Sequence, residues 1–113
     1  MKNKLLLLMI PALMLASCTS KKPLYSWNGY DKTSYTYLKN NDEKATKALI
    51  KNYKTIIEKQ KGSRHIVPPG VYADYGFVLL QAGKTKEGSD MLKKEIELYP
   101  ESKVFIDRVI KML

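Results

Sequence analysis

The sequence predicts an all-α protein, a small helical domain that follows an N-terminal targeting segment. Apolar residues recur at three- and four-residue spacing along most of residues 31–113, which is the period of amphipathic helices. Prolines and glycines separate these periodic stretches, as they do between helices. The chain contains one cysteine, which excludes an intramolecular disulfide framework. Stability must therefore come from packed helices or from a partner.

Residues 1–17 have the layout of a secretory signal, with a basic start, a short apolar stretch and small residues before a cleavage point. The end of this segment, Leu15-Ala16-Ser17-Cys18, resembles the lipobox read by the lipoprotein signal peptidase. The resemblance implies recognition through Leu15, Ala16 and Ser17, and cleavage before Cys18. It also implies covalent lipid on the thiol and new amino group of Cys18. We expect no other cofactor and no metal.

Three alternatives explain this segment less well. A transmembrane helix needs about 20 apolar residues, whereas the apolar run covers only residues 5–16 and contains Pro11. An ordinary secretory signal would leave Cys18 unpaired in an oxidising compartment. A buried core helix would leave the basic start and the small residues before Cys18 unexplained.

Cleavage would leave residues 18–113, enough for one small domain. Residues 19–67 hold ten lysines and one arginine against four acids, whereas residues 68–113 hold seven of each sign. Lysines near a membrane gain from anionic headgroups, so this half could hold the domain on its membrane or face an acidic partner. A solvated lysine-rich helix face is the favoured explanation. Thr19 is not the aspartate that retains lipoproteins in the inner membrane, which implies the outer membrane facing the periplasm. We expect no nucleic-acid partner for an exported protein.

Residues 18–30 form the predicted lipid-anchored tether and aromatic segment. Tyr25 and Trp27 alternate as in extended chain, and Asn28-Gly29 marks a turn. Because tryptophan and tyrosine dominate interface hot spots, some aromatic residues are candidate partner-binding residues. The candidates are Tyr25, Trp27, Tyr30, Tyr72 and Tyr75. The favoured explanation, however, is that the aromatics cover the open end of a small helical core.

Residues 31–113 form the predicted helical domain, which starts with a short helix over about 31–39. The second helix is capped by Asn40 or Asn41, with Glu43 completing a capping box, and ends near Gly62. Its apolar stripe consists of Ala45, Ala48, Leu49, Tyr53, Ile56 and Ile57. We expect this stripe in the core, although a basic amphipathic helix is also typical of membrane surfaces.

Three more helices follow. Pro68-Pro69 opens the third helix and Gly83 ends it, Thr85 caps the fourth, and the last begins near Ser102. His65 lies in the loop before the third helix and is expected at the surface, because no nucleophile, carboxylate cluster or metal-ligand spacing accompanies it. Asp74, Glu95 and Asp107 are expected to be helix-surface or capping charges.

Residues 72–100 resemble one tetratricopeptide (TPR) unit, a helical pair of roughly 34 residues. Tyr72 lies at the first aromatic position, Gly76 at the small close-packing position and Leu92 at the large apolar position of the second helix. Gly88 and Glu95 replace alanines that are usual in the repeat. The resemblance implies a TPR-like hairpin with the last helix as its cap. A plain helical hairpin is the alternative.

Nearly all of residues 18–113 resembles domain-of-unknown-function family 4810 of small bacterial lipoproteins. The resemblance rests on the segments 25–30, 67–76, 95–102 and 105–108. In that family the tryptophan of the aromatic motif is more often followed by glycine, whereas here Asn28 follows Trp27. It implies that this chain, like similar lipoproteins, accompanies a lipoprotein related to the curli secretion channel component. The resemblance attaches no enzymatic activity to the chain.

These observations together predict a non-enzymatic, membrane-anchored accessory or scaffold for an envelope protein complex, with no small-molecule substrate. The alternative is a membrane-surface or cell-wall-associated structural lipoprotein that acts through its basic half. An enzyme is the third possibility and has the least support, because the chain has no nucleophile motif, no glycine-rich phosphate loop and no persuasive carboxylate pair.

Overall fold

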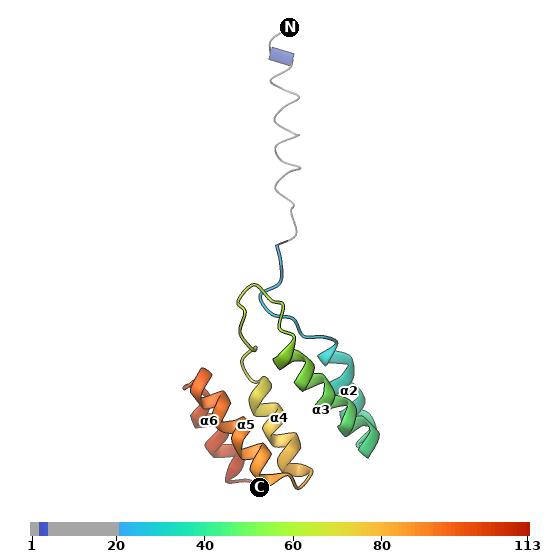
Figure 1. Ribbon diagram of the computed structural model, residues 1–113, viewed down its shortest axis with the longest axis vertical. Helices are drawn as coiled ribbons and strands as arrows, with labels where there is room; N and C mark the ends of the chain where they lie inside the picture. The colour runs from blue at the N-terminus through green and yellow to red at the C-terminus, as the bar shows by residue number, and fades with distance from the viewer. Residues whose placement is uncertain (1–2, 5–20) are drawn as a thin grey trace.

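The computed structural model describes residues 3–4 and 21–113 (Figure 1). Residues 21–113 contain five α-helices and no strand, which confirms the predicted all-α class. The helices are α2 (Tyr30–Asn40), α3 (Glu43–Glu58), α4 (Val71–Gln81), α5 (Thr85–Leu98) and α6 (Ser102–Ile110). In this described part, no helix combines the length and apolar character needed to cross a bilayer. The predicted lipobox residues Leu15, Ala16, Ser17 and Cys18 lie outside the described residues.

The helices form two consecutive pairs, α2–α3 and α4–α5, and α6 packs against the second pair (Figure 1). The hairpin predicted over residues 72–100 is α4–α5, and α6 covers it as a capping helix. Two clusters of buried side chains hold the helices together. Leu49 and Ile56 of α3 pack with Leu79 of α4 in the first cluster. Ala73 of α4, Leu92 of α5 and Ile106 of α6 form the second.

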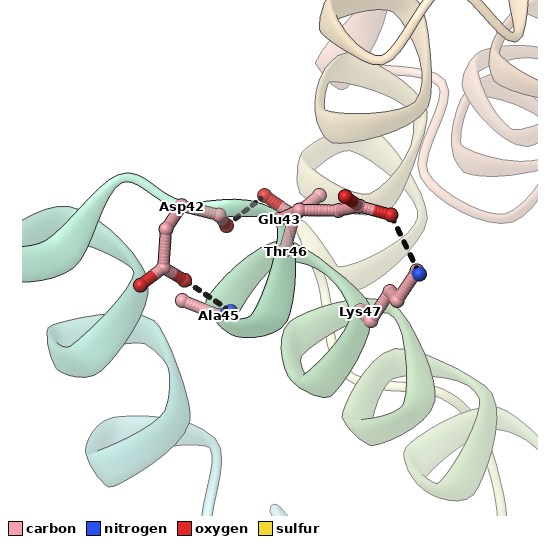
Figure 2. Close-up of polar contacts among 5 residues, drawn as sticks. All are labelled: Asp42, Glu43, Ala45, Thr46 and Lys47. Atoms are coloured by element: carbon pink, nitrogen blue, oxygen red, sulfur yellow. Dashed lines mark hydrogen bonds and ion pairs between the residues drawn. The ribbon is translucent and has the colours of Figure 1, made fainter.

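The start of α3 differs from the prediction (Figure 2). Asn40 is the last residue of α2, and Asn41 follows in a left-handed conformation with φ of 47°. The N-cap is Asp42, whose carboxylate accepts a 2.7 Å hydrogen bond from the backbone N–H of Ala45. Glu43 forms no capping box, because it is the first helical residue after Asp42 and not the third. Its carboxylate pairs instead with Lys47 at 2.6 Å. The asparagines were the wrong choice because they terminate the preceding helix.

Two further details of α3 differ from the sequence prediction. Ala48 of the predicted apolar stripe is exposed, whereas Ala45, Leu49, Tyr53 and Ile56 are buried. The helix ends at Glu58 rather than at Gly62. Gly62 lies instead in the following loop, where it is buried against the backbone of residues 24–25.

The helix starts in the second pair also shift from the predicted residues. Pro68 and Pro69 precede α4 instead of opening it, because Gly70 stands between them and the helix as a left-handed N-cap with φ of 90°. Gly83, with φ of 79°, does form the turn after α4. Thr85 does not cap α5: it is the first helical residue, and Lys84 precedes it without a side-chain capping bond.

Glu95 on α5 is fully buried, at 0 % exposure, so it is not a helix-surface charge, and of the two predicted roles only that of a capping charge remains. Its Oε1 accepts hydrogen bonds from the backbone N–H of Gly70 at 2.7 Å and from the Ser102 hydroxyl at 3.2 Å. One carboxylate oxygen thus joins the start of α4, the end of α5 and the start of α6. Asp107, by contrast, forms an i,i+4 pair with Lys103 at the surface.

Candidate docking groove

Helices α2 and α4 run parallel to one another. Two hydrogen bonds join them, each between residues that lie 44 positions apart in the sequence. The Tyr30 hydroxyl donates to Asp74 Oδ2 at 2.8 Å, and the Tyr37 hydroxyl donates to Gln81 Oε1 at 3.0 Å. Seven residues, about two helical turns, separate the two donors on α2 and likewise the two acceptors on α4. These two bonds therefore fix the helices along about 10 Å of their length.

A groove lies between α2 and α4, with α3 forming its floor. Its narrower part encloses about 220 Å³ and has Leu49 and Tyr53 of α3 at the base. A larger part, of about 550 Å³, adjoins the first. Tyr37 and Val78 line both parts. Most of the narrow part is apolar, with Leu38 and Phe77 on opposite walls. Leu38 is 77 % exposed, so the wall from α2 presents an apolar side chain to solvent.

A chain of aromatic rings leads from the tether segment into one end of this groove. Trp27 lies 6.4 Å from Tyr25 and 5.6 Å from Tyr30, measured between ring centroids. Tyr30 in turn lies 5.8 Å from Tyr53, which stacks on Tyr75 at 5.4 Å. The exposed ring of Trp27 is thus connected through Tyr30 to rings that belong to the core.

The Tyr30–Asp74 pair gives this end of the groove its electrostatic character. Burial, together with the adjacent Asp74 carboxylate, raises the pKa of Tyr30 to about 12. Desolvation raises the pKa of Asp74, and the hydrogen bond from Tyr30 opposes that rise. The Tyr30 phenol is the donor of this pair, and the Asp74 carboxyl group accepts at Oδ2 and leaves its other oxygen for a further contact. The groove offers a negative group beside apolar walls.

The structure separates the five aromatic residues that the sequence proposed for partner binding. Tyr25, Trp27 and Tyr30 are brought together at the groove end. Tyr75 is only 5 % exposed and belongs to the core, where a docked partner would not reach its ring. Tyr72 is half-buried elsewhere, with the Lys94 ammonium 5.8 Å from its ring centroid.

The sequence did not predict the groove itself: Phe77 carried no signal, and Asp74 was expected only as a helix-surface or capping charge. One available signal was a shared spacing: Tyr30 and Tyr37 are seven residues apart, and so are Asp74 and Gln81. His65 is exposed in its loop, as expected. Within residues 3–4 and 21–113, no three histidine, cysteine or acidic side chains lie close enough together to hold a metal ion. What the groove offers is a shaped apolar surface with one carboxylate.

Comparison with known proteins gives one match. The family model described as Domain of unknown function (DUF4810) matches residues 24–109, which is most of the chain. No curated protein and no solved structure matches. The matched region runs from the tether segment through α6 and contains the whole groove.

Proposed function

The chain belongs to the DUF4810 family, and from that premise we propose that it is a non-enzymatic accessory or scaffold lipoprotein of the cell envelope. In this proposal Cys18 carries covalent lipid and holds the domain on the periplasmic face of the outer membrane. The groove between α2 and α4 docks a segment of an envelope protein. The family resemblance suggests a partner similar to the curli secretion channel lipoprotein.

The observation that carries the proposal is the solvent-accessible apolar wall of the groove. Leu38 is a large aliphatic residue at 77 % exposure, and it faces α4 across a recess rather than standing alone on a convex surface. A partner segment with an apolar side chain would cover Leu38 and Phe77, and a cation on the same segment would meet Asp74. This arrangement favours a protein partner with an apolar and basic segment.

Helix α2 supplies a matched pair of positions for the test. Leu38 lines the groove, whereas Tyr35, at 65 % exposure, is a large apolar residue on the same helix that does not. A photoreactive phenylalanine derivative is introduced at either position in the full-length chain, and cells are irradiated before the adducts are identified by mass spectrometry. We expect one envelope protein to be enriched with the probe at Leu38 and not with the probe at Tyr35.

A second step ties the captured protein to the groove. With the probe moved to Ser34, which also lines the groove, the substitution Leu38→Glu should abolish the adduct and Tyr35→Glu should not. Equal capture from both faces, or an adduct that survives Leu38→Glu, would overturn the docking proposal.

The alternative function, a membrane-surface or cell-wall-associated structural lipoprotein, is favoured by the excess of lysine in residues 19–67. It predicts that a form lacking residues 1–18 binds anionic liposomes at low salt, and that Leu38→Glu leaves this binding unchanged. Leu38→Glu, which should abolish capture of a partner under the docking proposal only, therefore separates the two candidates.

A further inference from the structure

The segment that enters the domain is bound to the loop between α3 and α4. The Pro23 carbonyl accepts from the Ser63 N–H at 3.0 Å, and the Leu24 carbonyl accepts from the Arg64 N–H at 3.2 Å. The Gln60 side chain accepts from the Ser26 N–H at 2.6 Å. Figure 1 shows this loop beside the point where the described chain begins, at one end of the domain. Residues from both segments therefore share one surface.

That surface is basic and partly apolar. Residues 21–27 and 58–66 together contain five lysine and arginine residues against one acid, Glu58. Leu24 is 57 % exposed and Trp27 43 % exposed beside these cations. We call the surface the tether patch, and it consists of Lys21, Lys22, Leu24, Lys59, Lys61 and Arg64, all of which are exposed.

We propose that the tether patch lies on anionic phospholipid headgroups and sets the orientation of the domain on its membrane. The inference rests on the proposed lipid at Cys18. Three residues of fully extended chain span about 10 Å at most, so a lipid at Cys18 holds Lys21 within that distance of the interface. Lysine and arginine at this depth are attracted to anionic headgroups. An exposed leucine among them would enter the interface as the apolar faces of peripheral proteins do.

The proposed contact has a consequence for the groove. Helix α2 begins at Tyr30, directly after the tether segment, and α4 begins after the loop that carries Arg64. Both helices therefore run away from the patch. The Tyr30–Asp74 end of the groove is the end nearer the bilayer, and the Tyr37–Gln81 end lies about 10 Å farther out. A docked partner segment would extend away from the membrane.

Spin labels on the full-length, membrane-extracted protein test this orientation. Acylation of Cys18 would leave an introduced cysteine as the only free thiol. One label is attached at Ser63→Cys in the patch loop and a control label at Lys86→Cys in the first turn of α5, at the opposite end of the domain. The protein is reconstituted into phosphatidylcholine vesicles with or without phosphatidylglycerol. Accessibility of each nitroxide to oxygen and to a water-soluble nickel complex then reports its depth.

We expect the label at Ser63 to lose access to nickel and gain access to oxygen when phosphatidylglycerol is present, and to revert at high salt. The label at Lys86 should not change. Reversal of the patch charges by Lys59→Glu, Lys61→Glu and Arg64→Glu should abolish the shift. The matched variant Lys39→Glu, Lys44→Glu and Lys51→Glu makes the same charge change on exposed residues of α2 and α3 and should retain it.

Several outcomes overturn the proposal: no difference between the two labels, a shift that is insensitive to salt, or equal loss with both triple variants. The effect of salt on the label at Ser63, measured with all patch lysines and arginines in place, tests the proposal without any charge variant. Mass spectrometry of the extracted protein reports lipid on Cys18 independently. An unlipidated Cys18 contradicts the proposed anchor, whereas a lipidated protein without the label shift contradicts the tether patch alone.

Discussion

Gly76 of α4 and Gly88 of α5 face one another at the crossing of the hairpin. A Cβ on Gly76 would lie 2.9 Å from the carbonyl oxygen of Gly88, and a Cβ on Gly88 would lie 2.8 Å from the carbonyl oxygen of Gly76. The contact explains why glycine stands at position 88, where the repeat resemblance predicts alanine. A methyl group there would push against backbone, which cannot move without separating the helices.

Replacing Gly88 by alanine should therefore lower stability, against the trend of helix propensity. Propensity alone would favour alanine by about 1 kcal/mol, whereas overpacking typically costs about 1–3 kcal/mol. We expect the overpacking cost to prevail and the midpoint of urea unfolding to fall. Lys93→Ala, at an exposed position on the same helix, serves as the control and should leave the midpoint nearly unchanged. A Gly88→Ala variant that is more stable than the natural protein would contradict the close approach.

The hydrogen bond between Tyr30 and Asp74 should be visible in the titration of the carboxylate. Because this bond lowers the pKa of Asp74 against the effect of desolvation, Tyr30→Phe should raise that pKa further. The lost bond should also cost about 1 kcal/mol of unfolding free energy. Carboxyl ¹³C chemical shifts followed by NMR against pH measure the first effect. Tyr37→Phe removes the other α2–α4 bond and should leave the pKa of Asp74 in place.

Alkaline pH should weaken the packing of α2 on α3 and α4. The pKa of Tyr30 is raised to about 12 in the folded protein, against about 10 in an unfolded chain, so the native state holds this proton more tightly. The resulting stability is fully present below pH 10 and is lost as pH rises toward 12. Burial also raises the pKa of Tyr53, so this residue should add to the same loss of stability at alkaline pH. Unfolding midpoints between pH 9 and 12, compared with those of Tyr30→Phe, should show a shallower decline in the variant.

The helices could be predicted from the sequence because their apolar periodicity is local, whereas their exact ends could not. Asp42 and Asn41 are both acceptable N-caps by residue type. The choice between them depends on Asn41 adopting the left-handed conformation that ends α2. Likewise, Gly62 resembles a helix stop, but it is needed where the tether crosses the loop. In both cases a neighbouring segment decided the boundary.

The groove could not be predicted because it depends on pairs of residues that are distant in the chain. The sequence resemblance found one helical pair, α4–α5, and left α2 as a short helix of unspecified position. The structure sets α2 parallel to α4 through Tyr30 and Tyr37. Glu95 shows the same limit in the core: a glutamate on a highly charged helix suggests the surface. Its burial is offset by Gly70 and Ser102, which both donate to Oε1, while Oε2 is buried without a hydrogen-bond partner among the described residues.

Removing the Glu95 carboxylate should destabilise the second helical pair. Glu95→Ala would leave the part-buried N–H of Gly70 without its acceptor and would open a cavity beside α6, which together should cost about 2 kcal/mol. Glu95→Gln keeps a carbonyl oxygen for Gly70 and should cost less. Guanidinium unfolding of both variants measures this order. A smaller loss in Glu95→Ala than in Glu95→Gln would show that the Gly70 contact contributes little.

Gly62 should control whether the tether segment stays attached to the domain. A Cβ at this position would overlap the backbone of Leu24 and Tyr25, so Gly62→Ala should displace residues 23–26 and break the bonds from Ser63 and Arg64. We expect faster amide exchange at Ser63 and Arg64 and faster proteolysis within residues 21–27, while α4–α6 remain protected. Ser63→Ala alters the adjacent side chain and keeps the backbone bonds, so it should match the natural protein. Unchanged exchange in Gly62→Ala would mean that the loop can yield without releasing the tether, and that the tether patch does not depend on this contact.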